Sequence, residues 1–205
     1  MRLVSVAPSI GLVLATSVFG GLGCGTARGA RVDYSAEADP RKHDFVLGPA
    51  DVLRVTVWHN PDLSADPIVR PDGRITLPLI GDVPVSGRTT NEVQALVTEK
   101  LKVFVKDEAA LVTVAVTAVN SYRFTVMGNV EKAGTYSATH YVTFSEAMTL
   151  AGGPNRFATP EDTVIRRPDG ANPPRLIPVD YPRVARGDAP QQDLVVVAGD
   201  IIYVP

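Results

Sequence analysis

The sequence predicts an α+β fold made of two small modules, and three patterns carry this prediction. Several short stretches alternate between apolar and polar residues, as half-buried strands do. Two segments combine a helix-capping motif with apolar residues at helical spacing, which predicts one helix in each module. Glycine and proline number 17 each among 205 residues, above the ~12% of an average protein. This surplus indicates many turns and disfavours an all-helical bundle.

Residues 1–23 have the composition of an export signal. Arg2 precedes the apolar stretch Leu3–Leu22, whose densest part is Ile10–Phe19. That dense part is about half the ~20 residues that a membrane-spanning helix needs, so we predict a cleaved signal peptide rather than a permanent anchor.

The single cysteine, Cys24, directly follows this stretch. Signals of bacterial lipoproteins end in small residues before a cysteine that becomes acylated, and the sequence here resembles such a site, although Gly21 stands where leucine is usual. We expect an acylated Cys24, and sorting to the outer membrane because Gly25 follows it. The alternative is simple cleavage after Ala27, which removes the cysteine. Residues 24–43 are therefore predicted to be a lipidated N-terminus and a flexible tether.

The first predicted module spans residues 44–119. Asp51–Trp58 alternates with period two and is predicted to be a strand, and a second strand is expected near Ile68-Val69. Pro71-Asp72-Gly73 predicts a tight turn, because aspartate and glycine tolerate left-handed backbone. Arg74–Leu77 then continues as the hairpin partner.

A helix is predicted to follow in the same module. Thr89 and Glu92 have the spacing of a capping box, in which each side chain binds an amide at the helix start. The apolar residues after them fall on one helical face: Val93, Leu96, Val97, Leu101 and Phe104. Leu111–Val119 alternates again, which predicts a closing strand on which the helix packs.

The second predicted module spans residues 120–205. Arg123–Gly128 is predicted to be a strand, and Val130–Tyr136 a turn that leads into another. Thr143 and Glu146 form a second capping box, so we expect a short helix that ends at the terminator Gly152-Gly153-Pro154.

Short strands complete this module. Thr163–Arg167 is predicted to be a strand, and a further short strand at Arg175–Val179 lies inside a proline-rich, loop-like segment, 171–193. Leu194–Val197 and Ile201–Val204 are expected to be the closing strands, with a turn at Gly199-Asp200 between them. The whole pattern resembles a β-grasp, a mixed sheet curled around one short helix.

The sequence offers no arrangement of residues for catalysis, a cofactor or a metal. His43, His59 and His140 lie far apart and share no metal-ligand spacing. No serine lies in a nucleophile elbow, and no glycine-rich loop matches a phosphate-binding motif. Four aspartates stand beside glycine and are interpreted as turn formers: Asp72, Asp82, Asp169 and Asp200.

Net charge and aromatic residues bear on two kinds of binding function, nucleic-acid binding and sugar binding. The net charge is −2, whereas nucleic-acid-binding proteins usually carry clustered basic residues. The sequence therefore disfavours a nucleic-acid-binding protein. Sugar-binding proteins often stack sugar rings on exposed aromatic side chains, and the sequence contains five candidates: Trp58, Tyr122, Tyr136, Tyr141 and Tyr203. Each of them is equally suited to packing at a strand edge, so the sequence alone predicts no sugar site.

The motifs taken together resemble the bacterial outer-membrane polysaccharide export (OPX) family. In that family a polysaccharide biosynthesis and export domain precedes a soluble-ligand-binding β-grasp (SLBB) domain. The resemblance to the first domain rests on Leu47–Leu53, Val57-Trp58, Pro61–Ser64, Pro71–Ile75 and Leu77–Gly81. The resemblance to the second rests on Val126–Val130, Ala133–Tyr136, Ala151–Gly153 and Gly199–Pro205.

The resemblance implies a non-catalytic role at the periplasmic face of the outer membrane. Lipid-anchored copies of the chain would form a ring, a homo-oligomer that conducts capsule or exopolysaccharide polymer. It also implies an inner-membrane partner, the polysaccharide co-polymerase or tyrosine autokinase. Long members continue into a pore-lining helix, so reliance on a separate outer-membrane β-barrel is expected here. The alternative is a monomeric periplasmic module that binds a sugar or another small ligand.

The motif residues are expected to act structurally, as turn formers and as close backbone contacts in such a ring. These residues are Gly48, Asp51, Pro71, Asp72, Gly73, Pro78, Gly81, Gly128, Gly134, Gly152, Gly153, Gly199 and Asp200.

Overall fold

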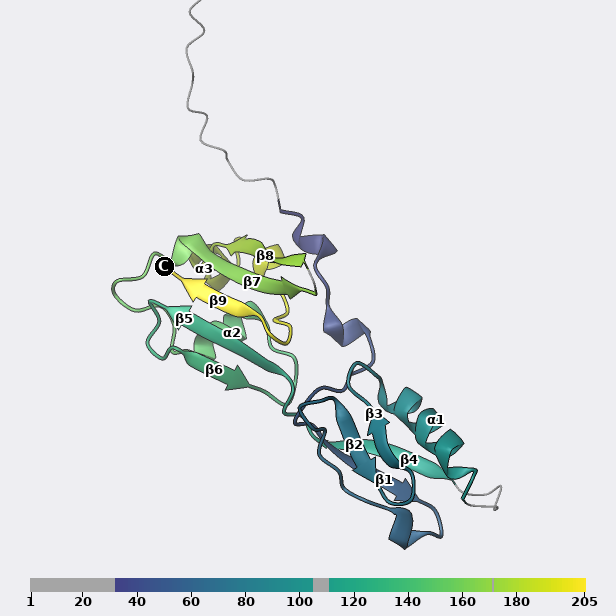
Figure 1. Cartoon of the computed structure of the whole chain (residues 1–205). Helices are drawn as coiled ribbons and strands as arrows, with labels where there is room; N and C mark the ends of the chain where they lie inside the picture. The colour runs from purple at the N-terminus through teal and green to yellow at the C-terminus, as the bar shows by residue number, and fades with distance from the viewer. Residues whose placement is uncertain (1–31, 105–110, 171) are drawn as a thin grey trace, which may run out of the picture. The chain divides into compact units, whose positions relative to one another are not determined.

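A computed structural model describes residues 32–104, 111–170 and 172–205 of the chain (Figure 1). The expected signal peptide and Cys24 lie outside these residues. Within them, no helix is both long enough and apolar enough to cross a membrane. Helices and strands occur in both modules, so the predicted α+β class is confirmed.

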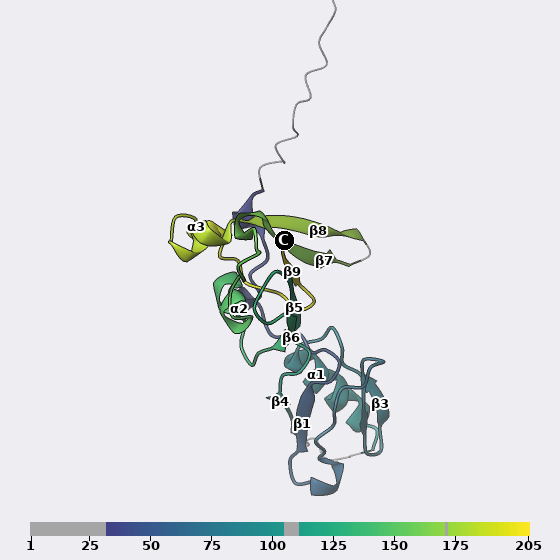
Figure 2. The ribbon, with the colours of Figure 1, turned by 90° about the vertical axis from the view of Figure 1, so that its left-hand side faces the viewer.

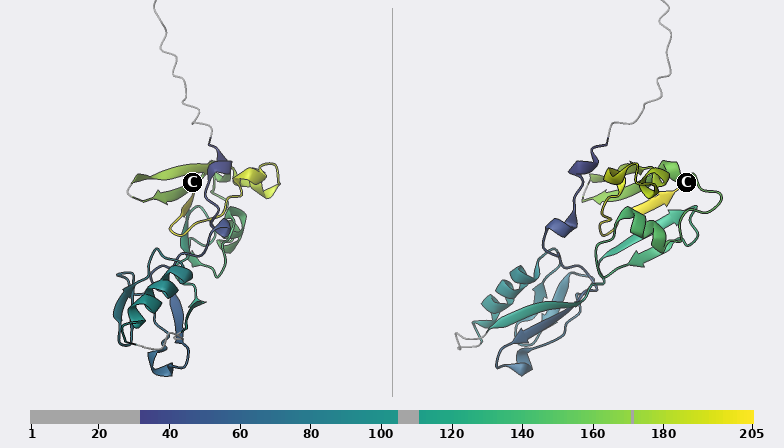
Figure 3. Two further views of the ribbon diagram at one scale, coloured as in Figure 1. Left: turned by 90° about the vertical axis from the view of Figure 1, so that its right-hand side faces the viewer. Right: turned by 180° about the vertical axis from the view of Figure 1, so that it is seen from behind.

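The first module contains two antiparallel strand pairs and one helix. Strand β1 (Val52–Val57) pairs with β4 (Val112–Ala118), and β2 (Arg74–Leu77) pairs with β3 (Gly81–Pro84). Helix α1 (Thr90–Leu101) lies against β4 (Figure 3). Buried aliphatic side chains from all these elements form one core, which includes Leu53, Val55, Ile75, Val83, Val93, Val97 and Val112.

Helix α1 begins where the capping box predicts. The Thr89 hydroxyl accepts a hydrogen bond from the Glu92 amide at 3.3 Å, and the Glu92 carboxylate accepts one from the Thr89 amide at 2.8 Å. Three residues of the predicted face are buried, namely Val93, Val97 and Leu101. Phe104 lies beyond the last turn of α1 and is 54% exposed. The apolar helical face predicted from the sequence therefore extends one turn too far.

The strand expected near Ile68-Val69 is absent from the structure. Ala65 and Ile68 make only isolated bridges to β1, because Pro67 between them has no amide hydrogen to continue a ladder. The hairpin partner of Arg74–Leu77 is therefore β3, and the connecting turn is Pro78–Ile80 rather than the one at Pro71–Gly73.

The second module is a five-stranded mixed sheet with the strand order β6-β5-β9-β7-β8. Strands β5 and β9 are parallel, and the other neighbours are antiparallel. Helix α2 (Phe144–Leu150) packs on one face of this sheet, as the β-grasp pattern predicts (Figure 2). The strands are β5 (Arg123–Gly128), β6 (Gly134–Ser137), β7 (Thr163–Asp169), β8 (Asn172–Val179) and β9 (Ile201–Val204).

Two predictions for this module are wrong. Leu194–Val197 is not a strand: the Val196 amide donates to the Val142 carbonyl, and only Val195 makes an isolated bridge. The proline-rich segment contains an additional helix, α3 (Tyr181–Ala185). Neighbouring residues define the start of α3. The Asp180 side chain accepts a hydrogen bond from the Arg183 amide, and proline is well tolerated in a first helical turn.

The expectation of a flexible tether up to residue 43 is also wrong for its described part. Residues 34–42 contain two short 3-10 helices, η1 (Tyr34–Ala36) and η2 (Pro40–Lys42). Asp33 and Asp39 cap these helices through their side chains. The Tyr34 hydroxyl donates to the Pro178 carbonyl on β8 at 2.8 Å. This N-terminal segment therefore packs against the second module.

Candidate functional site

Asp51 binds residues 119–122, the connecting segment between the two modules. Its carboxylate is fully buried and accepts four hydrogen bonds, two of them from the Asn120 and Ser121 amides at 2.7 and 2.8 Å. The Gly48 amide and the Ser121 hydroxyl supply the other two, at 2.9 and 2.8 Å. The β1–β4 pairing brings these groups together, because Asp51 immediately precedes β1 and Asn120 follows β4. Gly48 fits here because a Cβ on it would lie 2.5 Å from the Ser121 Cβ.

We expect Asp51→Ala to lower the free energy of unfolding by about 3 kcal/mol, because it leaves buried amides without their charged acceptor. Urea denaturation of the purified chain measures this change. Asp62→Ala is the matched control: Asp62 is exposed, so a change within about 0.5 kcal/mol is expected. Equal effects of the two substitutions would show that the Asp51 contacts do not stabilise the fold.

Arg167 lies at the centre of a buried ionic cluster in the second module. Its side chain, on β7, donates to the Asp200 carboxylate at 2.8 and 3.1 Å and to the Val195 carbonyl at 2.8 Å. It also donates to Glu37 at 3.1 Å. The Glu37 side chain is 2% exposed and accepts a further hydrogen bond from Arg175 on β8. The cluster therefore fixes the N-terminal segment on the sheet of the second module.

The interpretation of Asp200 as a mere turn former is incomplete. Asp200 does follow a turn glycine, Gly199, which has a φ of +85°. Its side chain is nevertheless fully buried and paired with Arg167. Burial raises the pKa of the Asp200 carboxyl, and the hydrogen bonds from Arg167 and from the Val197 amide oppose that rise.

The other aspartates beside glycine lie on the surface. Asp72 and Asp82 both pair with Arg70, at 2.8 and 3.1 Å, around the β2–β3 hairpin. Hydrogen bonds from Thr76 and Arg70 lower the pKa of Asp82. Asp169 is exposed at the end of β7. Asp72 lies in the turn before β2, as the sequence predicts, and Asp169 ends β7 just before a turn. The turn-forming interpretation is wrong for Asp82, which lies within β3 and pairs with Thr76 of β2.

The remaining motif residues are prolines that lie in turns and glycines that differ in backbone geometry. Pro71 lies in the turn before β2 and Pro78 in the turn after it. Gly134 has neither a positive φ nor any atom within 4 Å of an added Cβ, so the structure gives no steric reason for glycine there. The other motif glycines after Gly48 have positive φ, namely Gly73, Gly81, Gly128, Gly152, Gly153 and Gly199.

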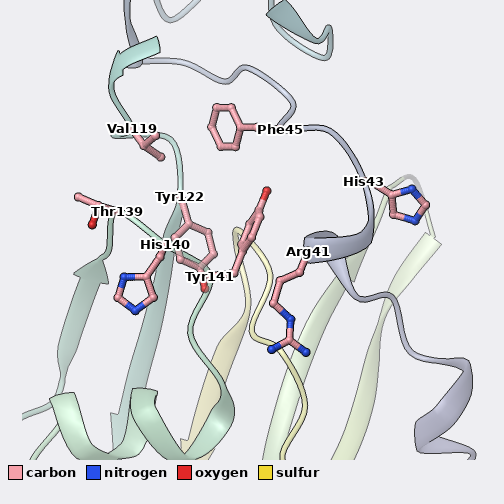
Figure 4. Close-up of a pocket in the computed structure, with 8 residues that line it drawn as sticks. All are labelled: Arg41, His43, Phe45, Val119, Tyr122, Thr139, His140 and Tyr141. Carbon is pink, nitrogen blue, oxygen red and sulfur yellow. The ribbon is translucent and has the colours of Figure 1, made fainter. Parts of the chain in front are cut away.

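A hollow of about 360 Å³ lies beside the connecting segment (Figure 4). Phe45, Tyr122 and Tyr141 contribute aromatic rings to it, and His43 and His140 contribute polar side chains. The Tyr122 hydroxyl donates to the Val196 carbonyl at 2.9 Å and accepts from the Val142 amide at 3.1 Å. No sequence pattern predicts this hollow, because its rings come from segments far apart in the chain.

No cluster of three or more potential metal ligands occurs within residues 32–104, 111–170 and 172–205. His43 and His140 line the same hollow, whereas His59 lies in the loop after β1, where its ring contacts Trp58.

Comparison with known proteins identifies two domains in this chain. A family model described as polysaccharide biosynthesis/export protein matches residues 39–117, and the SLBB domain model matches residues 123–175. Together the two matches cover more than half of the chain.

Several characterised proteins are similar to this chain. The EPS I polysaccharide export outer membrane protein EpsA of Ralstonia solanacearum is 32% identical over 60% of this chain and 38% of its own length. The exopolysaccharide production protein ExoF of Rhizobium meliloti is 33% identical over 57% of this chain and 30% of its own length. The polysialic acid transport protein KpsD of Escherichia coli is 37% identical over 29% of this chain and 11% of its own length. The chain thus spans about half or less of the length of these relatives.

Proposed function

Because this chain belongs to the outer-membrane polysaccharide export family, we propose that it is a non-catalytic component of an apparatus that exports capsule or exopolysaccharide. The observation that carries the proposal is the order of its domains. An export domain at residues 39–117 is followed at once by an SLBB domain at residues 123–175. The printed names of its relatives, which describe polysaccharide export, production and transport, support the same role.

The proposal places the chain at the periplasmic face of the outer membrane, anchored through an acylated Cys24. The outer-membrane name of EpsA supports this location. An inner-membrane polysaccharide co-polymerase is the protein partner that we propose for this chain.

We also propose that copies of the chain assemble into a ring. The two edges of the five-stranded sheet differ in their suitability for such contacts. Strand β8 contains Pro173, Pro174 and Pro178, which have no amide hydrogen and so disfavour pairing with another strand. Strand β6, at the opposite edge, contains no proline and is the better candidate for a contact between copies.

Native mass measurement of the purified chain distinguishes this assembly from the alternative, a monomeric ligand-binding module. A ring predicts a closed complex of several copies. A mass equal to one copy at all concentrations would favour the monomeric module.

Deletion of the gene tests the export role itself. We expect surface polymer to be lost while polymer of normal length accumulates inside the envelope. Shortened or chemically altered polymer would instead point to an enzyme, and normal surface polymer would contradict the proposed role.

A further inference from the structure

The aromatic hollow beside the connecting segment has the lining of a sugar-binding site. Figure 4 shows Phe45, Tyr122 and Tyr141 arranged around it, each from a different segment of the chain. The Tyr122 and Tyr141 rings meet edge to face, with centroids 5.1 Å apart. Tyr122 is only 2% exposed, so the partly exposed rings of Phe45 and Tyr141 are the faces that a ligand can reach. The C–H groups on one side of a pyranose ring pack well against such a face, which carries negative charge density.

Polar groups suited to sugar hydroxyls accompany these rings. The Tyr141 hydroxyl has no hydrogen-bond partner within the described part of the chain, whereas that of Tyr122 is fully used. A tyrosine hydroxyl is protonated at neutral pH and can both donate and accept a hydrogen bond. Burial raises the pKa of Tyr141 further. Thr139 and His140 add further donors and acceptors to the lining.

The charge of the lining favours an uncharged ligand. Arg41 is its only permanently charged residue among those described, and two hydrogen bonds of 2.9 and 3.0 Å pair it with Asp39. The positive charge is thus already compensated, and no carboxylate lines the described hollow. An acidic sugar would find no free counter-charge here.

The available volume fits more than one sugar unit. The hollow of about 360 Å³ is in the range of ~300–1,000 Å³ that is usual for ligand sites. A second hollow of about 620 Å³ adjoins it and shares Phe45, Tyr122 and Tyr141. Neighbouring units of a polymer segment in the two hollows would both contact the shared, partly exposed rings of Phe45 and Tyr141.

We propose that this aromatic hollow binds neutral pyranose units of the polysaccharide. The inference rests on the proposed function, because export supplies the polymer that the site contacts. Binding of each unit should be weak, since a conduit must release the polymer as it moves.

Saturation-transfer NMR on the full chain in detergent solution tests the proposal, with cellotetraose, maltotetraose and tetragalacturonate as probes. We expect saturable binding of at least one neutral tetrasaccharide, with a dissociation constant of about 1 mM, and weaker binding of the acidic one. Tyr141→Ala should weaken binding about tenfold. Tyr141→Phe, which keeps the ring and the packing, should weaken it less.

Tyr203→Ala is the matched control, because Tyr203 is a half-exposed tyrosine on β9 that does not line the hollow. Its binding should equal that of the wild type. No saturable binding of either neutral probe, preference for the acidic probe, or an equal loss in Tyr203→Ala would overturn the proposal. If neutral probes fail to bind while the deletion strain loses surface polymer, the sugar site is refuted and the export role stands.

Discussion

An Arg167→Met variant is expected to lose about 3–5 kcal/mol of unfolding free energy, the usual effect of removing one partner from a buried ion pair. Methionine keeps much of the apolar volume but supplies no charge. Asp200, which is fully buried, then loses its counter-charge, and Glu37 loses one of its two arginine partners. Urea denaturation at neutral pH measures the loss.

The unfolding free energy lost in Arg167→Met should become smaller as the pH falls. Burial already raises the pKa of Asp200, and the substitution removes the Arg167 hydrogen bonds that oppose this rise. A carboxyl whose pKa is raised on folding stabilises the fold below its unfolded pKa of ~3.9, and this stability is lost as the pH rises through the folded pKa. The variant should therefore be closer to the wild type at roughly pH 5 than at pH 8.

Arg166→Met controls for the loss of a positive charge on the same strand, because Arg166 is exposed. It should change the unfolding free energy by no more than about 0.5 kcal/mol. A small, pH-independent effect of Arg167→Met would mean that the ionic cluster does not stabilise the second module.

Gly128→Ala is expected to destabilise the second module by about 2–5 kcal/mol, through backbone strain and overpacking. Gly128 has a φ of +94°, which is unfavourable for alanine. An added Cβ would lie 2.0 Å from the Val204 carbonyl oxygen, so β5 and β9 would have to separate at this end of their parallel pairing. Thermal or urea unfolding of the purified variant measures the effect.

Gly134→Ala is the control within the same sheet. Gly134 lies at the start of β6, without positive φ and with no atom within 4 Å of an added Cβ. We expect a change within about 0.5 kcal/mol. A similar loss in both variants would contradict the argument from close backbone contact.

The local elements of the fold were predictable because their signals lie within a few residues of each other. Thr89 and Glu92 define the start of α1, and Thr143 and Glu146 define the start of α2, each through hydrogen bonds three residues apart. Alternation correctly predicted β1 and β4. The prediction failed near Ile68, where the apolar pattern suggests a strand but Pro67 interrupts the ladder.

The candidate site was less predictable, because its contacts join residues far apart in the chain. Arg167 meets Asp200 across 33 residues and Glu37 across 130. The composition around Glu37 is typical of a tether, and the glycine beside Asp200 indicates only a turn-forming role for that aspartate. Similarly, Tyr141 is one of five aromatic residues that the sequence offers for sugar stacking, but only the fold places it in a hollow with Phe45 and Tyr122.

Depletion of the chain in growing cells tests its role in export most directly. Expression from an inducible promoter is switched off, and surface and envelope-retained polymer are quantified over time together with polymer length. We predict that the ratio of surface to retained polymer falls in step with the amount of the chain, while polymer length stays constant. A constant ratio, or polymer that becomes shorter as the chain disappears, would contradict an export role.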